Sequence, residues 1–191
     1  MDAYKCICSR PSVRNYLPKK ISQKIISDIL VAASMAPSGL NAQPWYFVVV
    51  NNKKKIEQMR QIVLGSLPDS DFVKKYKTFF NAPCIISVFL DIGKKWYHKN
   101  SITENKTNIV LENSDYFSVA AAIENILLAA HSFNLGSCWC HVSPEYSVEL
   151  EEFLDCPSNH KLVSNITLGY YEDKITKPRR KSIDGICRFI S

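Results

Sequence analysis

The chain has 191 residues, of which 46% are hydrophobic and 22% charged, and this composition excludes wholesale disorder. Its length predicts a single domain over residues 1–191, with a core large enough to need no disulfide or metal. The apolar runs are too short to cross a bilayer and no apolar leader opens the chain, so we expect a cytoplasmic protein without a membrane segment.

The formal net charge is +6, from 24 Lys and Arg against 18 Asp and Glu. The basic residues gather in two short clusters, one at Arg10 and Arg14 and one between Lys174 and Lys181. No zinc-finger spacing or RNA-binding aromatic signature accompanies them, so we expect no nucleic-acid partner. Two such clusters suit one small phosphate group, although solvated surface charge remains the alternative.

Three helices, the first of them amphipathic, and two buried strands are predicted in the first half. Ser22 has the position of an N-cap, and the isoleucines after it recur with helical spacing until Pro37 ends the pattern. The run 45–50 is aromatic and β-branched and predicts a buried strand, as does 84–90. Helices are expected over about 53–64 and near 72–80.

A long apolar helix is predicted over 114–133, and it is apolar nearly all the way round. Such a helix must be buried on every side, which favours a helix shared with a second subunit, with a central helix of a monomer as the alternative. Residues 91–113 before it are polar and without periodicity, and we expect a lid or substrate loop there.

Strands over 137–142 and 162–170 enclose a short helix that begins at Pro144. Helices and strands therefore alternate along the chain, which predicts an α+β or α/β fold.

Seven cysteines occur, at positions 6, 8, 84, 138, 140, 156 and 187, and their odd number argues against a disulfide framework. Cys138 and Cys140 would face the same side of a strand, but zinc sites usually use Cys-x-x-Cys. We expect small buried side chains there and predict no metal site.

Two segments carry residues that bind ligands. In residues 10–14, two arginines flank Ser12, and a guanidinium offers paired donors that match phosphate oxygens. In the loop 37–45, Gly39 allows close backbone approach, while Asn41 and Gln43 can donate and accept hydrogen bonds. Each pattern alone is also compatible with an ordinary surface turn.

Five blocks, in order along the chain, resemble the FMN-dependent nitroreductase family. They are Arg10-Pro11-Ser12-Val13-Arg14, residues 36–45, residues 122–130, residues 135–139, and Lys177-Pro178-Arg179-Arg180. The resemblance implies an α+β fold, a nitroreductase-like α/β/α sandwich with a central, mainly antiparallel sheet. It also implies an intertwined homodimer with one FMN at each subunit interface.

The same resemblance assigns roles to residues by position. Arg10 and Ser12, with Pro11 and Val13 between and beside them, match the phosphate-binding segment, and Arg14 matches a basic residue on the ribityl and pyrimidine side. The segment that reaches the FMN of the other subunit comprises Ser38, Gly39, Leu40 and Asn41. The stretch near flavin N5 comprises His141, Val142 and Ser143. Arg180, or Arg179 in the neighbouring register, matches the C-terminal phosphate ligand.

Two departures from the family pattern affect these assignments. Pro11 stands where a basic residue is usual, which removes one charge and one backbone donor. Lys181-Ser182 follows the C-terminal arginines where proline is usual, so the register of Arg179 and Arg180 is uncertain by one position.

The function implied by the resemblance is an FMN-dependent oxidoreductase. It would pass hydride from NAD(P)H through flavin N5 to a flat, electron-poor acceptor such as a nitroaromatic or quinone, in a ping-pong cycle. Because the cofactor carries this chemistry, no catalytic acid or base need be assigned. The alternatives are a reductive dehalogenase or flavin-fragmenting enzyme on the same scaffold, and a non-catalytic protein that binds or stores FMN.

Overall fold

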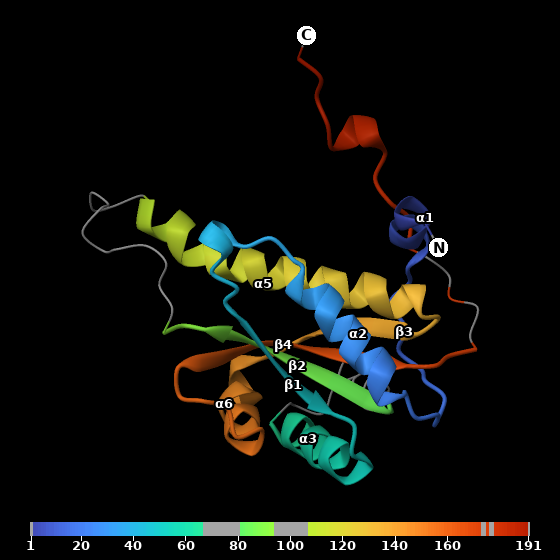
Figure 1. Cartoon of the computed structure of the whole chain (residues 1–191), viewed down its shortest axis with the longest axis vertical. Coiled ribbons are helices and arrows are strands. Elements are labelled where there is room, and N and C mark those ends of the chain that lie inside the picture. The colour runs from blue at the N-terminus through green and yellow to red at the C-terminus, as the bar shows by residue number, and fades with distance from the viewer. Residues whose placement is uncertain (1, 67–80, 94–106, 173–174, 176–177, 191) are drawn as a thin grey trace.

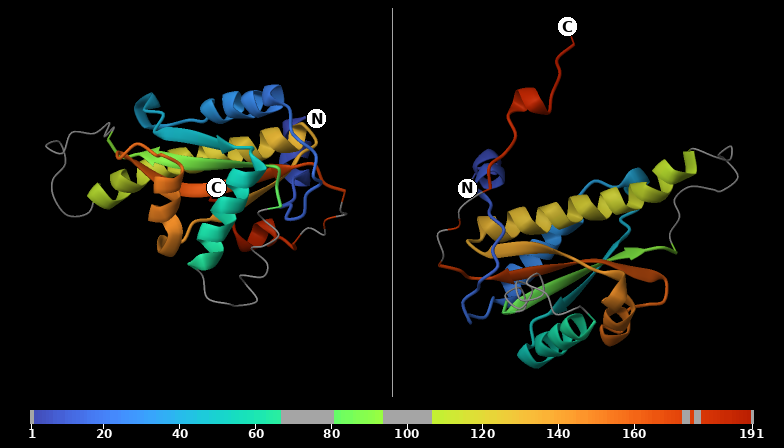
Figure 2. Two further views of the ribbon diagram at one scale, coloured as in Figure 1. Left: turned by 90° about the horizontal axis from the view of Figure 1, so that it is seen from below. Right: turned by 180° about the vertical axis from the view of Figure 1, so that it is seen from behind.

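The computed structural model describes residues 2–66, 81–93, 107–172, 175 and 178–190. Its centre is a four-stranded sheet in the order β1-β2-β4-β3, and every neighbouring pair of these strands is antiparallel. Two helices cover one face and two cover the other, giving the three layers visible in Figures 1 and 2. This confirms the predicted α+β class and the antiparallel sheet.

The strands lie where the apolar runs predict them. They are β1 (Trp45–Val50), β2 (Cys84–Asp91), β3 (Gly136–His141) and β4 (His160–Gly169). β2 is buried along its whole length because it pairs with β1 and β4 and has helices on both faces. β3 is an edge strand, so one of its sides has no neighbouring strand of the sheet.

The helices begin and end largely as predicted. They are α1 (Ala3–Ser9), α2 (Gln23–Ser34), α3 (Lys53–Gly65), α5 (Thr107–Ser132) and α6 (Pro144–Phe153), with short 3-10 turns η1 (Gly39–Asn41) and η3 (Ile183–Gly185). Ser22 caps α2 as predicted, since its hydroxyl accepts from the amide of Ile25 at 3.3 Å. The helix expected near 72–80 lies outside the described residues.

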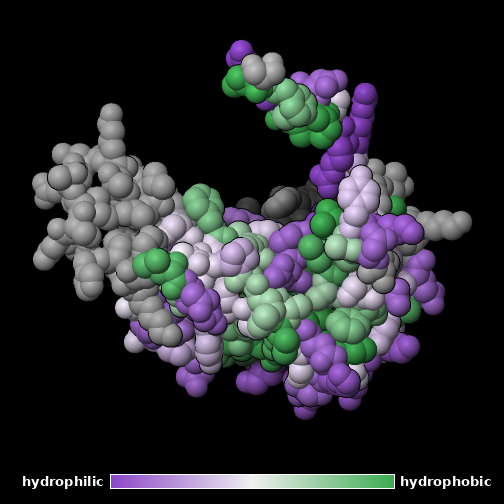
Figure 3. All heavy atoms as spheres, turned by 45° about the horizontal axis from the view of Figure 1, so that its top comes forward, coloured by the Kyte–Doolittle hydropathy of each residue, from purple (hydrophilic) through white to green (hydrophobic). Residues whose placement is uncertain are grey.

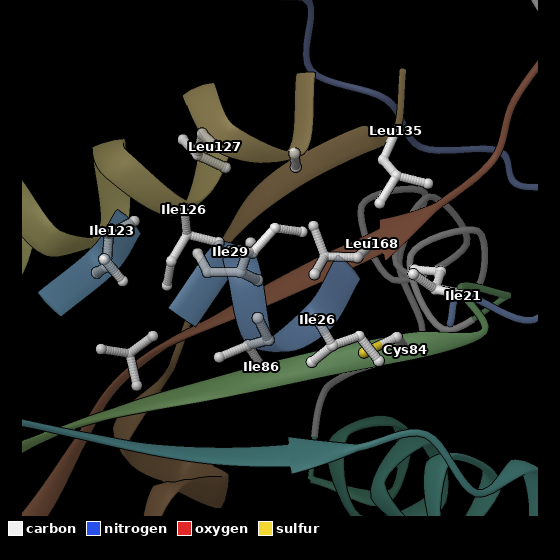
Figure 4. Packing of buried hydrophobic residues seen from close by; sticks show 14 of the residues in the cluster. Ile21, Ile26, Ile29, Cys84, Ile86, Ile123, Ile126, Leu127, Leu135 and Leu168 are labelled. Carbon is white, nitrogen blue, oxygen red and sulfur yellow. The ribbon is translucent and has the colours of Figure 1, made fainter. Parts of the chain in front are cut away.

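The main hydrophobic core lies between the sheet and the pair α2 and α5. Ile26 and Ile29 from α2 meet Ile123 and Ile126 from α5 above Ile86 of β2 (Figure 4). A second cluster on the other face joins α3 and α6 to the sheet through residues that include Met59, Phe89, Tyr146 and Leu150. The single sheet thus separates two apolar layers.

The prediction for residues 91–113 is wrong at both ends. Asp91 is the last residue of β2, where its carboxylate accepts from the amide of Gly93 at 2.9 Å. The long helix begins at Thr107 rather than 114, so the second part of the expected loop is helical. Residues 107–113 include Ile109, Val110 and Leu111 in one short run, and such a run by itself does not distinguish a helix from a strand or a loop. Residues 94–106 lie outside the described residues, and the lid remains a prediction.

Over residues 114–132, the fully buried side chains of α5 lie on the side that faces the sheet and α2. Val119, Ala122 and Ile126 are fully buried, whereas Phe117 is 69% exposed. Figure 2 shows α5 forming the outermost layer over much of its length. None of the described helices is long and apolar enough to cross a bilayer.

Gly136 is a point of close contact between the start of β3 and the N-terminal segment. A Cβ at this position would lie 2.5 Å from Val13 Cγ2 and 2.8 Å from Tyr171 Cδ1. Any larger residue must therefore push residues 12–14 away from the sheet.

We predict that Gly136→Ala lowers the free energy of unfolding by about 1–3 kcal/mol, because the added methyl group overpacks this contact. Urea unfolding of the purified protein measures the change. Gly65→Ala is the matched control, since an added Cβ there meets nothing within 4 Å. Because Gly65 is in the last turn of α3, Gly65→Ala should leave the free energy of unfolding unchanged or raise it by up to about 1 kcal/mol. Equal effects of the two substitutions would contradict the assignment.

Candidate cofactor-binding site

Residues 10–14 run along the exposed edge of the sheet beside β3. Ser12 forms a parallel bridge with Ser137, and the amide of Val13 donates to the carbonyl of Ser137 at 2.8 Å. The side chain of Val13 is fully buried in a small cluster with Tyr16 and Ala82. The structure therefore fixes the backbone of the predicted phosphate-binding segment against the start of β3.

Tyr16 holds this segment in place from beneath. Its hydroxyl donates to the carbonyl of Val13 at 2.6 Å and lies 2.7 Å from Thr167 Oγ1. A hydroxyl has one proton, so Thr167 is the donor in the second hydrogen bond. Burial raises the pKa of Tyr16 well above its usual range, although the hydrogen bond with Thr167 opposes this shift. The phenol therefore stays protonated and remains a donor.

Arg10 and Arg14 bring positive charge to the same part of the sheet. The pKa of the Cys138 thiol is lowered, first by a hydrogen bond from Cys140 and then by the charges of Arg14 and Arg10, against the opposing effect of burial. Both guanidinium groups are thus within electrostatic reach of one residue on β3. The Nε atom of Arg10 also lies 3.5 Å from Glu124 Oε1 on α5.

Cys138 and Cys140 lie side by side on β3, as the strand prediction requires, and both are buried. The pKa of Cys140 is raised well above its ordinary value, first by its hydrogen bond with Cys138 and then by burial. Among the described residues no group of three or more His, Cys, Asp or Glu side chains could hold a metal ion.

The stretch 141–143 ends β3 and leads into α6. His141 is exposed, and its carbonyl accepts from the Tyr146 hydroxyl at 3.0 Å. Val142 is buried in the second core cluster, so only its backbone can face a ligand. Ser143 caps α6 by position, and its hydroxyl donates to the carboxylate of Glu145. Tight attachment at both ends gives this stretch a fixed backbone.

The loop 38–43 has an unusual backbone. Leu40, Asn41 and Gln43 have φ angles of 48°, 57° and 49°, in the left-handed region that residues other than glycine rarely adopt. The Ser38 hydroxyl stabilises the turn by accepting from the amide of Gln43 at 3.0 Å. Leu40 is 79% exposed. Strain of this kind concentrates at sites that bind ligands or partners.

Within one chain this loop is remote from residues 10–14. Figure 1 places η1 beside the N-terminal half of α5, whereas α1 and the start of the 10–14 segment lie at its C-terminal end. The end of α2, which leads into the loop, is held by Asn125 of α5, whose side-chain amide donates to the carbonyl of Ala32 at 3.0 Å. The predicted site residues thus form two separate groups on the protomer.

Arg179 and Arg180 are exposed, and they belong to a C-terminal arm, residues 178–190, that stands away from the body of the molecule (Figure 1). The structure records no contact between either arginine and Arg10 in the described part of the chain. The convergence of arginines from both ends of the chain on one phosphate therefore remains a prediction.

Sequence reasoning missed three residues at this site. Tyr16 and Thr167 form the support for Val13, and Glu124 pairs with Arg10. Glu124 lies within residues 122–130, one of the blocks that resemble the family, but nothing in the spacing of that block relates Glu124 to Arg10. Contacts across 114 or 151 residues cannot be read from a single sequence.

A model of the nitroreductase family matches residues 7–170, so the chain belongs to the nitroreductase family. The protein is therefore of the oxidoreductase class. The chain is 32% identical over 176 residues to a putative NADH dehydrogenase/NAD(P)H nitroreductase from Archaeoglobus fulgidus, covering 91% of this chain and 87% of the relative. It is also 28% identical over 186 residues to an iodotyrosine deiodinase from Thermotoga neapolitana, covering 94% of each.

Solved structures share the fold. A BluB-like flavoprotein from Clostridium difficile 630 superimposes with a TM-score of 0.80 over 100% of both chains at 26% identity. An FMN-dependent nitroreductase from Clostridium difficile R20291 has a TM-score of 0.67 at 26% identity, covering 92% of this chain and 91% of that one. The nitroreductase-like sandwich predicted from the sequence is thereby confirmed.

We predict that Tyr16→Phe destabilises the protein by about 1–3 kcal/mol, because the carbonyl of Val13 loses its hydrogen bond in a buried place. Urea unfolding measures the loss. Tyr46→Phe is the control, since Tyr46 is 42% exposed and should stay within about 0.5 kcal/mol of the wild type. A Tyr16→Phe variant as stable as this control would show that the hydroxyl does not hold Val13.

Proposed function

We propose that the protein is an FMN-dependent NAD(P)H oxidoreductase whose phosphate site is formed by residues 10–14. The observation that carries the proposal is the bridge between Ser12 and Ser137, which fixes two arginines and a serine at the edge of the sheet. The flavoprotein and FMN-dependent descriptions of the two structural neighbours support the choice of cofactor.

The donor set fits the phosphate of FMN. Arg10 and Arg14 supply charged N–H groups and Ser12 supplies a hydroxyl, the types of group that bind phosphate oxygens in proteins. In addition, the Ser137 hydroxyl is buried without a hydrogen-bond partner among the described residues, directly across the bridge from Ser12. A buried hydroxyl without a partner is costly, and a bound polar group would relieve this cost.

When bound, FMN would supply the redox chemistry, accepting hydride from NAD(P)H and passing it to a flat, electron-poor oxidant such as a nitroaromatic or quinone. The chain would contribute binding and orientation. The rigid backbone at 141–143 would offer hydrogen bonds at the end of β3, where the flavin ring is expected. Arg14 would place positive charge beside the ring, which favours its anionic reduced form.

We further propose that the active form is a homodimer. The group at residues 10–14 and the group at 38–41 are remote from each other in one chain, so one protomer's loop can complete the other's site. Uncovered apolar side chains lie on the α2, η1 and α5 layer, and these are Val31, Met35, Leu40 and Phe117. The arm 178–190 carries four more, Ile183, Ile186, Phe189 and Ile190, and stands clear of the body in Figure 3.

Reductive dehalogenation is the second candidate function. The similarity to an iodotyrosine deiodinase over 94% of both chains favours it. Such a reaction would use the same cofactor site. Product analysis with a halotyrosine and a nitroaromatic, each supplied with reduced cofactor, separates the two functions.

We predict that the purified protein has the visible spectrum of oxidised FMN and is bleached by NADH or NADPH without oxygen. Arg10→Ala should lower the affinity for FMN by about tenfold or more, because it removes a charge-assisted contact to phosphate. Flavin occupancy and fluorescence titration measure both effects. Lys53→Ala on α3 is the control for loss of one exposed positive charge. A colourless protein that FMN cannot reconstitute would refute the proposal.

We predict that Phe117→Glu dissociates the dimer and lowers flavin occupancy, because a charge then replaces an apolar contact at the interface. Light scattering measures the mass of each variant. Val148→Glu is the matched control, since Val148 is 61% exposed but lies on α6, in the other helical layer. A wild-type protein that is monomeric at micromolar concentration would contradict the prediction.

A further inference from the structure

The N-terminal helix α1 is held along one stripe of α5. The Cys6 thiol donates to the carbonyl of Leu128 at 3.3 Å, and Ser9 Oγ shares a hydrogen bond of 2.7 Å with His131 Nε2. Glu124 lies four residues before Leu128, and residues with this spacing share one face of a helix. The contacts to α1 and the contact to Arg10 therefore follow the same face of α5.

Arg10 leaves the end of α1 beside this stripe. Its amide donates to the carbonyl of Cys6 at 3.1 Å and so closes the last turn of α1. Its side chain is only 18% exposed, and its Nε atom faces Glu124 Oε1. A long, flexible side chain is thereby confined at its base by the helix end and near its tip by a carboxylate.

The contact uses one particular nitrogen of the guanidinium. This group carries one N–H on Nε and two on each terminal nitrogen, and all lie in one plane. A carboxylate held at the Nε side leaves the N–H groups of the terminal nitrogens to bind an anion bidentately. We propose that Glu124 is a positioning residue that directs the terminal N–H groups of Arg10 toward the phosphate of the bound cofactor. This inference rests on the proposed function, which assigns that phosphate to residues 10–14.

Two effects of Glu124 on phosphate binding have opposite signs. Its negative charge repels the phosphate and competes for Arg10, whereas its ion pair with Nε, at 3.5 Å, reduces the conformational freedom that Arg10 must lose on binding. Glu124 is 43% exposed, so solvent screening weakens the repulsion. The Arg10 side chain, only 18% exposed, lies against Glu124 already, so we expect the orienting effect to dominate and removal of the carboxylate to weaken phosphate binding.

The affinities for FMN and for riboflavin, which lacks the phosphate, test whether Glu124 strengthens or weakens phosphate binding. The full-length protein, stripped of flavin, is titrated with each compound as wild type, Glu124→Ala and Glu124→Gln. We expect Glu124→Ala to weaken FMN binding by about threefold to tenfold and leave riboflavin binding unchanged, as loss of one positioning contact implies. Glu124→Gln keeps an oxygen acceptor for Nε and should stay within about twofold of the wild type. Tighter FMN binding in both variants, or equal losses for both compounds, would overturn the inference.

A double substitution tests whether the effect passes through Arg10. In the Arg10→Ala background, Glu124→Ala should change FMN affinity by less than about 1.5-fold, because coupled residues are not additive. Glu57→Ala is the matched control, since Glu57 is 49% exposed and pairs with an arginine on α3, remote from β3. An effect of Glu124→Ala that persists without Arg10 would also overturn the inference. A wild type that binds FMN and riboflavin equally would instead refute the proposed phosphate site itself.

Discussion

The docking of residues 12–14 on the edge of β3 is the constraint on which the rest of the site depends. An edge strand leaves backbone groups unpaired, and here the bridge between Ser12 and Ser137 satisfies part of this edge. Tyr16 and the tight contact at Gly136 fix the docked segment from two sides. Because Ser12 and Val13 are fixed, Arg10 and Arg14 lie on a backbone that is anchored before any ligand arrives.

The single chain has a well-packed core, but it keeps the two predicted ligand segments, 10–14 and 38–41, apart. Both core clusters are closed by helices that belong to the same chain. By contrast, the strained loop at η1, the outer face of α5 and the C-terminal arm expose apolar side chains that one chain does not cover. A second copy would bury these surfaces and bring the loop to the phosphate segment in one step. Oligomerisation and cofactor binding would then be linked, since each would stabilise the other.

In the described residues, the side chains near β3 are of types that bind and orient a ligand more than types that react with one. The buried thiol of Cys140 donates to the carbonyl of Cys138 at 3.7 Å, and His141 is exposed at the end of β3. The Ser9 and His131 pair serves to hold α1 on α5. This distribution is what a protein needs when its cofactor supplies the reactivity and the polypeptide supplies the geometry.

The sequence by itself determined the strands, most helix boundaries and the fold family. Apolar runs such as 45–50 and the cap at Ser22 are local signals, and they depend on residues a few positions apart. Short motifs also located residues 10–14 and 38–41 as candidate ligand segments. The early start of α5 at Thr107 was missed, because the short apolar run in residues 109–111 has no helical periodicity of its own.

Only the tertiary structure decided which residues support the predicted ligand-binding residues. It placed Tyr16 and Thr167 beneath Val13, Glu124 beside Arg10, and Val142 in the core, and it separated the loop at η1 from the phosphate segment. These contacts join residues that are far apart along the chain, and they exist because sheet pairing and helix packing bring distant segments together. The residue types at these positions are common in any protein, so their roles depend on the fold rather than on a local pattern.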